Sequence, residues 1–389
     1  MPRVELTSIP AISPSLAEVL RLCALRAGLS RADGAGLFVL GNPKAWLGIA
    51  YHEVLAGAGS HPGTSGEGLH EAAWVRALNR QHDRAQLHPL DRRFGLPERW
   101  PGYHLVRAMA LMRAQKIASE SGSASPPVAV QEKWNGRERW LSGANGGIVG
   151  RPDLVRGDAV VEYKTGDIHE HSDTGDNEVA KASYVRQVQL YAFLVKECTG
   201  RWPTRGVLLP MEGPPLEVEL EPAACERIAT DALELLDSYN RQIQAGGNAA
   251  GLANPSPQAC RWCSHQLLCS PFWEAADDSW SEHIGTAAVG GSALAPPQPI
   301  HGGAALALSV SGIEGTAILD AVGLAPLSPE IHPALRQIQT GTRVRVIGLA
   351  RRADGTVVPT ARTVLARLED LPVIVLCGGE TKSRDAAKT

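Results

Sequence analysis

The sequence predicts a mixed α/β domain followed by a small β-barrel. The first observation behind this prediction is the order of patterns in residues 150–245, where a hairpin is followed by a helix, two strands and a long amphipathic helix. The second is a series of short alternating strands beyond residue 300. The third is a hydrophobic content of 44%, which is that of a globular protein. Together they predict a mixed sheet flanked by helices, with the barrel after it.

Length and charge limit the possible classes of protein. A chain of 389 residues is long enough for two or three domains. It has no run of about 18 apolar residues, and residues 1–5 lack the charged and apolar regions of a signal peptide. We therefore expect a cytoplasmic protein with no membrane partner. The net charge of −3 gives no general sign of a polyanionic partner, so any nucleic-acid surface must be local.

Two helices are expected near the N-terminus. The first covers residues 13–27, with Ser13 as the N-cap and Pro14 at the first helical position. It carries Cys23, which by itself could be a small buried hydrophobic residue. The second helix starts near Gly48, which permits close packing, and presents His52. A lone histidine is more often a core or capping residue than a ligand.

Residues 71–116 combine basic and aromatic side chains. Two amphipathic helices, 69–87 and 103–119, fit this segment, in which Lys and Arg outnumber Asp and Glu. A basic helical surface with aromatic residues can follow a phosphate backbone and stack bases, although an ordinary solvated face fits equally well. The aromatic residues are Trp74, Phe94, Trp100 and Tyr103.

A β-hairpin over residues 150–166 contains the main candidate site. Gly157 and Asp158 form a two-residue turn of type II′ flanked by β-branched and aliphatic residues. The turn sets the register, so Asp153 faces Glu162 with the Cβ atoms about 5 Å apart. Lys164 lies two residues further on and therefore projects from the same face as Glu162.

This arrangement of charges predicts a metal site. Two carboxylates held this close repel each other unless a cation lies between them, and Mg²⁺ prefers oxygen ligands. A metal next to two carboxylates and a lysine suits the attack of water on a phosphodiester. A surface hairpin with solvated or ion-paired charges is the competing interpretation.

Neighbouring segments add further candidates. Residues 119–127 read as a linker, and residues 128–132 as a strand beside the hairpin that could bring Glu132 to the metal. Residues 167–178 read as a mobile acidic loop with solvent-exposed histidines. The helix predicted over residues 182–198 carries Gln187 and Tyr191, which lie four residues apart on one face.

Three cysteines form the strongest single metal signal. Strands in residues 207–220 and a helix over residues 222–245 precede Cys260, Cys263 and Cys269. Three thiolates are one short of the usual four for zinc or an iron–sulfur cluster, so a distant ligand is required. The remaining cysteines outside the N-terminal helix, namely Cys198, Cys225 and Cys377, are expected to be structural.

The C-terminal part reads as a linker followed by the barrel. Residues 283–305 are rich in Gly, Ala and Pro. Short strands at 305–310, 316–322, 342–350, 357–359 and 363–368 suit a small OB-type barrel. Its arginines form a basic face, but residues 301–377 contain no Phe, Trp or Tyr, so a packing role is at least as plausible as binding of single strands. These arginines are Arg343, Arg345, Arg351, Arg352, Arg362 and Arg367.

Taken in order, these motifs resemble the RecB-like branch of the PD-(D/E)XK nucleases, in the iron–sulfur form found in AddB-type helicase-nucleases and CRISPR-adaptation exonucleases. The resemblance covers about residues 12–275. The motifs that carry it are Cys23, His52, Glu132, Pro152-Asp153, Glu162-Tyr163-Lys164, Gln187-x-x-x-Tyr191 and the Cys260, Cys263, Cys269 group.

The resemblance implies a restriction-endonuclease-like fold and a role for each motif. Mg²⁺ or Mn²⁺ would be bound by His52, Asp153, Glu162 and the Tyr163 carbonyl, with Glu132 assisting. Lys164 would position the attacking water, and Gln187 and Tyr191 would contact DNA and brace the site. Cys23 would join the other three cysteines around a [4Fe–4S] cluster, with structural Zn²⁺ as the alternative.

The resemblance also implies an organisation and an activity. We expect a nuclease domain in residues 1–282 with a basic helical insertion at 60–125, a linker at 283–305, the barrel at 306–377 and a disordered tail at 378–389. The expected enzyme is a metal-dependent deoxyribonuclease that acts as an exonuclease on single-stranded DNA or DNA ends. We expect it to act in repair, recombination or anti-phage defence, together with a helicase or a similar complex. The alternative is a non-catalytic DNA-binding or adaptor subunit; retention of the acidic residues and the lysine favours catalysis.

Overall fold

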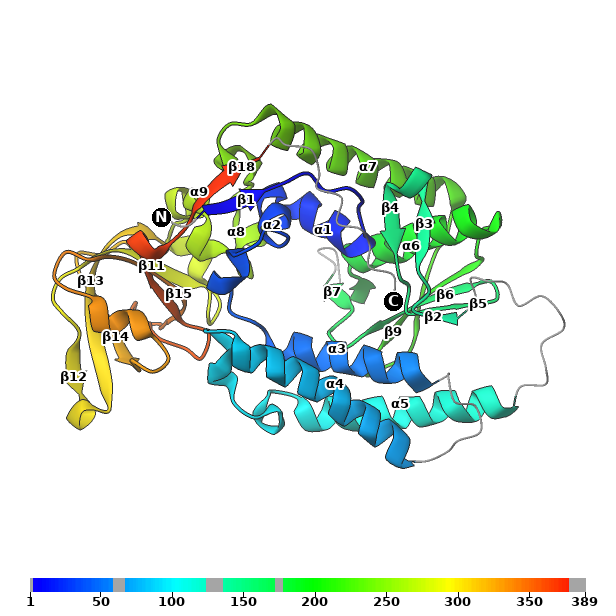
Figure 1. Cartoon of the computed structure of the whole chain (residues 1–389), viewed down its shortest axis with the longest axis horizontal. Helices are drawn as coiled ribbons and strands as arrows, with labels where there is room; N and C mark the ends of the chain where they lie inside the picture. The colour runs from blue at the N-terminus through cyan, green and yellow to red at the C-terminus, as the bar shows by residue number, and fades with distance from the viewer. Residues whose placement is uncertain (1–2, 59–66, 124–135, 172–177, 378–389) are drawn as a thin grey trace.

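The computed structural model describes residues 3–58, 67–123, 136–171 and 178–377. Two large sheets dominate these residues, one of five strands and one of seven. The five-stranded sheet lies on the right in Figure 1, between the helices α6 (Ala182–Thr199) and α7 (Pro222–Ala245) above and the helices of residues 43–123 below. The seven-stranded sheet lies on the left. The predicted α/β architecture of a mixed sheet with flanking helices is confirmed.

The five-stranded sheet has the order β10–β9–β6–β5–β2. Strands β6 and β9 run parallel, and the other neighbouring pairs run antiparallel. The chain passes from β6 through α6 before it returns as β9, as a parallel pair requires. The strand bounds are β2 (Gly136–Arg137), β5 (Leu154–Arg156), β6 (Ala159–Lys164), β9 (Arg205–Pro210) and β10 (Leu216–Val218).

The predicted hairpin register is confirmed. Val155 pairs with Val160 and Leu154 with Val161, so the next positions along this ladder are Asp153 and Glu162. The turn residue Gly157 has φ +62°, the left-handed region that a type II′ turn needs at its first central position.

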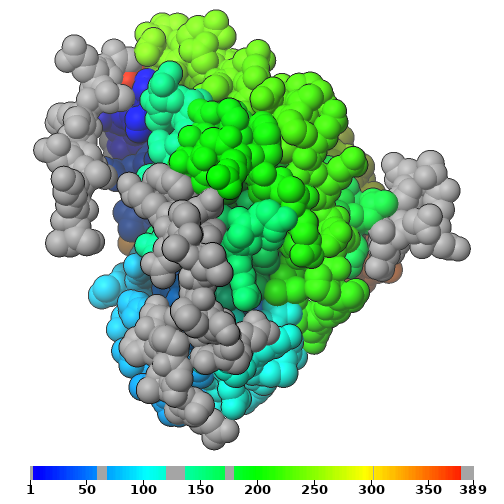
Figure 2. Space-filling view, turned by 90° about the vertical axis from the view of Figure 1, so that its right-hand side faces the viewer, coloured from blue at the N-terminus to red at the C-terminus, as the bar shows by residue number. Residues whose placement is uncertain are grey.

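Helices cover both faces of this sheet. On one face Val160 of β6 shares a core with α6, α7 and α1 (Pro14–Leu22). On the other face Val161 and Tyr163 share a core with α3 (Pro43–Ala58), α4 (Glu67–Leu87) and α5 (Tyr103–Ser123). Figure 2 shows green surface from the α6 and α7 region above cyan surface from the α5 region. Alternation along β6 therefore separates Glu162 and Lys164 from Tyr163.

The predicted N-terminal helix is divided at Cys23. Helix α1 begins after Ser13, whose Oγ accepts a hydrogen bond from the backbone N–H of Leu16 at 3.2 Å. Cys23 is extended, with φ −165° and ψ 114°, and α2 (Ala24–Leu29) starts directly after it. The single helix expected over residues 13–27 is therefore wrong, and the break turns Cys23 away from the helical path.

The two tryptophans of the helical segment are buried and do not form a base-stacking surface. Trp74 and Trp100 are 0% and 2% exposed and fill the core between α3, α4 and α5. Arg107 is bound by Glu71, with an Nη2–Oε2 distance of 2.7 Å, and Arg113 donates to backbone carbonyls of β9 and the residue after it. Base stacking by these tryptophans is excluded by their burial.

Other connecting segments differ from expectation. Strands β7 (His169–His171) and β8 (Glu178–Ala180) pair within the segment predicted as a loop. The short strands β3 (Leu141–Gly143) and β4 (Ile148–Gly150) form a further pair. Residues 119–123 of the predicted linker are helical, since α5 continues to Ser123, and the rest of that segment lies outside the described residues. The strand predicted at 128–132, with Glu132, lies outside the described residues.

The segment predicted as a linker contains two strands of the seven-stranded sheet. Strand β11 (Ala287–Ala293) lies between β13 and β15, and a Cβ on Gly291 would come within 1.6 Å of the Ser311 carbonyl oxygen. Small residues there allow close strand packing. The prediction of a linker is therefore wrong. Residues 316–321 are also not a strand, because β14 begins at Val322.

The remaining strands confirm the β-rich C-terminal part in outline. The bounds are β12 (Gln298–Ile300), β13 (Ala305–Gly315), β14 (Val322–Leu327), β15 (Arg343–Arg351), β16 (Val357–Val358) and β17 (Val364–Arg367). Within the described residues no strand pairing closes this sheet, so the OB-type barrel stays a prediction. Arg345 is buried in an ion pair with Glu314, with 3.0 Å between Nε and Oε1, and so is not part of an exposed basic face.

The two ends of the described chain lie together. Strand β1 (Arg3–Leu6) pairs in parallel with β18 (Val373–Leu376). The short helices α8 (Pro257–Cys260) and α9 (Ser270–Ala275) carry the late cysteine segment and lie near this pair in Figure 1. The tail predicted at 378–389 lies outside the described residues. None of the helices described here is both long and apolar enough to cross a bilayer.

Candidate active site

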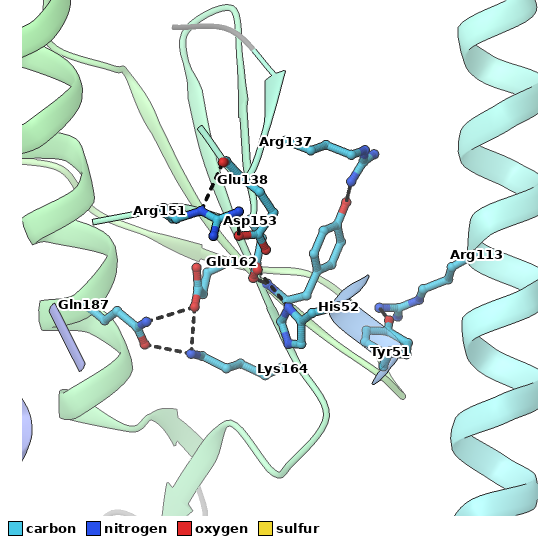
Figure 3. Close-up of polar contacts among 11 residues, drawn as sticks. Tyr51, His52, Arg113, Arg137, Glu138, Arg151, Asp153, Glu162, Lys164 and Gln187 are labelled. Carbon is cyan, nitrogen blue, oxygen red and sulfur yellow. Dashed lines mark hydrogen bonds and ion pairs between the residues drawn. The ribbon is translucent and has the colours of Figure 1, made fainter. Parts of the chain in front are cut away.

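His52, Glu138 and Asp153 form a group of potential metal ligands. Their ligand atoms all lie within 4.8 Å of one another, and no other such group of His, Cys, Asp and Glu is found among the residues that the structure describes. His52 comes from α3, Asp153 directly precedes β5 of the hairpin, and Glu138 directly follows β2 (Figure 3). The His52 Nδ1 atom is 2.8 Å from Asp153 Oδ1.

Glu138 was not identified from the sequence. Strand β2 pairs with β5, and the Glu138 N–H donates to the Asp153 carbonyl at 3.3 Å, so the two side chains meet. Glu138 has φ +51°, a conformation that non-glycine residues rarely adopt. Such strain is common at functional sites. Arg151 supports it by donating to the Glu138 carbonyl at 3.2 Å.

A second group lies beside the first on the α6 side of the sheet. Glu162 Oε1 accepts hydrogen bonds from Lys164 Nζ at 3.0 Å and Gln187 Nε2 at 2.9 Å. Lys164 Nζ also donates to Gln187 Oε1 at 2.7 Å and lies 4.5 Å from the centre of the Tyr184 ring. Lys164 is thus held by three partners and points toward the carboxylates (Figure 3).

One oxygen of Glu162 has no hydrogen-bond partner among the residues that the structure describes. The residue is only 6% exposed, and its Oε2 atom is buried without a hydrogen bond to any described group. Burying a carboxylate oxygen without a partner is costly. A divalent cation bound between Glu162 and Asp153 would satisfy it, so the residues present fit a metal.

The charges of this cluster are strongly coupled. Burial and the Asp153 charge raise the pKa of Glu162, and Lys164 opposes this rise. Burial and the same Asp153 charge raise the pKa of Glu138 to about 7. Burial lowers the pKa of His52, but the hydrogen bond and the charge of Asp153 outweigh it and the net shift is upward. The charge of Asp153 contributes to all three upward shifts, and a bound cation would neutralise it.

The backbone around Asp153 fixes its orientation. Asp153 is 7% exposed, and its Oδ2 accepts a hydrogen bond from the Tyr163 N–H at 2.6 Å. The Tyr163 side chain points to the opposite face, where its hydroxyl accepts from Arg137 Nη1 at 2.8 Å. The role predicted for the Tyr163 carbonyl remains a prediction.

Two glycines permit the helices to approach the site. A Cβ on Gly48 would lie 3.0 Å from Thr165 Oγ1, so α3 packs directly on the end of β6 and brings His52 to Asp153. A Cβ on Gly150 would lie 2.9 Å from Tyr191 Cε1. Tyr191 is buried on α6, and burial is the main cause of its raised pKa. It packs against the strand that leads to Asp153.

The four cysteines named for a cluster line one small cavity. Cys23, at the break between α1 and α2, shares it with Cys260, Cys263 and Cys269. Burial raises the pKa of Cys260 to about 11 and that of Cys269 to about 12. His265 also lines the cavity, and its Nδ1 atom is buried without a partner among the described residues.

The other cysteines have separate surroundings. The Cys198 thiol donates to the Ser142 carbonyl with 3.4 Å between the heavy atoms. Cys225 is buried on α7. Cys377, directly after β18, donates its N–H to the Leu6 carbonyl at 3.0 Å. None of these three lines the cysteine cavity.

The mixed sheet, the clustered carboxylates and the adjacent lysine define the class of metal-dependent nucleases. The family model of the PD-(D/E)XK nuclease superfamily matches residues 11–270, and the chain belongs to this superfamily. The match supports a metal-dependent nuclease with DNA as its substrate. No curated protein matches the chain.

The raised pKa of Glu138 leads to a prediction about metal binding. A proton on this carboxylate competes with the cation, so affinity for Mn²⁺ is expected to rise from about pH 6 to about pH 8 with proton release. Glu138→Gln should weaken binding and remove one released proton. Calorimetric titration in buffers of different ionisation enthalpy measures both quantities. Glu212→Gln, an exposed glutamate, is the matched control; unchanged proton release in Glu138→Gln would exclude Glu138 as a ligand.

Proposed function

We propose that the protein is a metal-dependent deoxyribonuclease whose catalytic cluster is built from the β5–β6 hairpin and α3. The observation that carries this proposal is the His52, Glu138 and Asp153 group beside the Glu162–Lys164 pair. Carboxylates, an imidazole and a lysine in a partly buried site suit hydrolysis of a phosphodiester. The superfamily match supports the same reaction.

Each residue has a role in this proposal. Asp153, Glu162, Glu138 and His52 would hold the cation, with the Tyr163 carbonyl completing the set and Glu132, which lies outside the described residues, assisting. When bound, Mg²⁺ or Mn²⁺ would polarise the phosphate and promote ionisation of water. Lys164, fixed by Gln187, orients the attacking water and offsets charge on the phosphate. Tyr191 braces the strand beneath Asp153.

The preferred substrate is single-stranded DNA or DNA ends, attacked as an exonuclease. Only the general reaction follows from the superfamily match, so polarity and strand preference need a direct experiment. End-labelled and circular DNA, each single- and double-stranded, should be incubated with Mg²⁺ and with Mn²⁺. Release of labelled nucleotides from linear single strands, with circles left intact, is the expected result. Equal cutting of circles would establish an endonuclease.

A non-catalytic DNA-binding or adaptor subunit is the second candidate. Such a protein would bind DNA but leave every substrate intact with both metals. The hydrogen bonds that hold Lys164 beside Glu162 favour catalysis, because an inactive site has no need to maintain them. Cooperation with a helicase in repair, recombination or defence is the proposed setting, and co-purification from cell extract tests it.

We also propose that Cys23, Cys260, Cys263 and Cys269 bind a [4Fe–4S] cluster. They line one cavity, and the donor set of four thiols fits this group. No three of their sulfur atoms lie within 4.8 Å of one another. A zinc tetrahedron, with Zn–S bonds of about 2.3 Å, needs sulfurs about 3.8 Å apart, and structural Zn²⁺ is the alternative group for this site. Brown, iron-containing protein after anaerobic purification is the expected result, and colourless zinc-containing protein would contradict it.

His52 is expected to favour Mn²⁺ over Mg²⁺. Mg²⁺ prefers an all-oxygen shell, whereas nitrogen ligands suit later transition metals better. Half-saturation of DNA cleavage should therefore need less Mn²⁺ than Mg²⁺, and His52→Ala should reduce this difference by roughly tenfold, the effect of about 1.4 kcal/mol. His104→Ala, on the exposed side of α5, is the control. Equal half-saturation for both metals, unchanged in His52→Ala, would mean that His52 is not a ligand.

A further inference from the structure

An exposed tryptophan lies between two of the cysteines. Trp262 separates Cys260 from Cys263 and is 50% exposed. The His283 ring is stacked beside it, with 6.3 Å between ring centres and an angle of 28° between the planes. The Arg362 guanidinium carbon lies 5.4 Å from the centre of the indole ring. We refer to these three side chains as the Trp262 platform.

The platform is not required to fill the interior. Trp273, a nearby residue in the chain, is 2% exposed and packs in the hydrophobic core. The guanidinium carbon of Arg345 lies 4.9 Å from the centre of the Trp273 ring. His283 and Arg362 are themselves exposed. Single exposed apolar residues are common and need no explanation. The distinguishing feature here is that three planar side chains from separate segments gather at one exposed place.

We propose that the Trp262 platform stacks bases of single-stranded DNA, an inference that rests on the proposed DNA substrate. Indole and imidazole rings offer π faces to any base, and a guanidinium stacks on bases while its charge attracts phosphate. The acidic Glu282 is adjacent to His283 in the chain, so charge alone does not define this surface. All three side chains of the platform can stack on a DNA base.

The platform is separate from the metal site. In Figure 1, α8, which ends two residues before Trp262, lies left of the centre, whereas β5 and β6 lie on the right. One nucleotide cannot reach both places. A strand that occupies the metal site must extend over several nucleotides before it meets Trp262, so the contribution of the platform should depend on the length of the strand.

Binding of oligothymidylates of increasing length tests this inference. Fluorescence anisotropy is measured without divalent metal, so that no cleavage occurs. For the wild-type protein, affinity should rise in a step once the strand reaches both places. Trp262→Ala should remove this step and weaken binding of long strands by about tenfold, because stacking of one base contributes on this scale. Short strands should bind Trp262→Ala and wild type equally.

Matched variants separate stacking from folding. Trp262→Phe keeps an aromatic face and should retain most of the affinity for long strands. Arg362→Ala should weaken their binding, whereas Arg227→Ala, which removes an exposed arginine from α7, should not. Melting temperature and iron content are measured for every variant. Equal loss of binding and of melting temperature in Trp262→Phe and Trp262→Ala would show that the residue acts through the fold and would overturn the proposal.

The remaining outcomes are decisive as well. Wild-type affinity of Trp262→Ala for long strands would exclude the platform from DNA binding. An equal loss of affinity for duplex DNA of the same length would exclude a preference for single strands. Failure of the wild-type protein to cleave DNA with Mg²⁺ or Mn²⁺ would refute the nuclease proposal but leave the binding result standing, since binding is measured without metal.

Discussion

Lys164→Ala is expected to lower metal-dependent DNA cleavage by about 10²- to 10³-fold at saturating Mg²⁺ or Mn²⁺, the usual effect of removing one group that stabilises developing charge. The ammonium group lies 3.0 Å from Glu162 Oε1 and 2.7 Å from Gln187 Oε1, so it is fixed rather than mobile. In the proposed mechanism, its loss removes the ammonium group that offsets charge on the phosphate. Rates of cleavage of a labelled DNA strand measure the effect.

Folding of the Lys164→Ala variant has to be measured as well, because Lys164 contacts the buried Glu162 carboxylate. Lys164 opposes the rise in the pKa of Glu162, so its removal leaves the buried carboxyl more easily protonated. Lys164→Met keeps the apolar stem and should be as inactive as Lys164→Ala while melting closer to wild type. Lys196→Ala, on the exposed side of α6, controls for loss of a lysine. Wild-type cleavage by pure, folded Lys164→Ala protein would refute the assignment.

Cys23→Ser is expected to lose bound iron and to lower the melting temperature as strongly as Cys263→Ser. Both residues line the same cavity, although Cys23 belongs to the start of the chain and Cys263 to the late loop. A group that joins them closes a loop of about 240 residues and removes a large conformational entropy from the unfolded chain. Folding and binding of a structural metal group are coupled, so loss of one ligand should be severe.

Cys198→Ser provides the matched control for this prediction. Its thiol bonds to the Ser142 carbonyl and lies outside the cavity, so iron content and melting temperature should stay near wild type. Iron content is measured on anaerobically purified protein, and melting is followed by circular dichroism. If Cys23→Ser kept full iron and wild-type melting, the fourth ligand would have to be another residue. His265, whose Nδ1 has no partner among the described residues, would then be tested first.

Local chemistry made much of the site predictable. Gly157 and Asp158 set the hairpin register, because a two-residue turn allows one pairing and alternation then assigns each side chain to a face. Lys164 and Glu162 followed from that register. Gln187 could be placed near them only through the family resemblance, since its contact with Glu162 depends on how α6 packs on the sheet.

Sequence patterns do not predict the features that depend on pairing between distant segments. Glu138 reaches the metal group because β2, two residues long, pairs with β5, and so short a strand leaves little pattern in the sequence. The sequence of β11 predicts a linker because its alanines and glycines resemble a flexible segment. Two of them, Gly290 and Gly291, lie against Glu314 and Ser311 of β13, where a Cβ atom would have no room. The burial of Trp74 and Trp100 likewise depends on three helices meeting.

The pairing of β1 with β18 has a consequence for protein synthesis. The two strands run parallel in register from Arg3 with Val373 to Leu6 with Leu376. At a translation rate of about 5–20 residues per second, β1 waits roughly 20 to 75 seconds for its partner to be made. During this interval its backbone groups must be satisfied by water or by other proteins. A ribosome that stops before β18 therefore releases a chain whose first strand has an open edge, which makes incomplete products prone to aggregation.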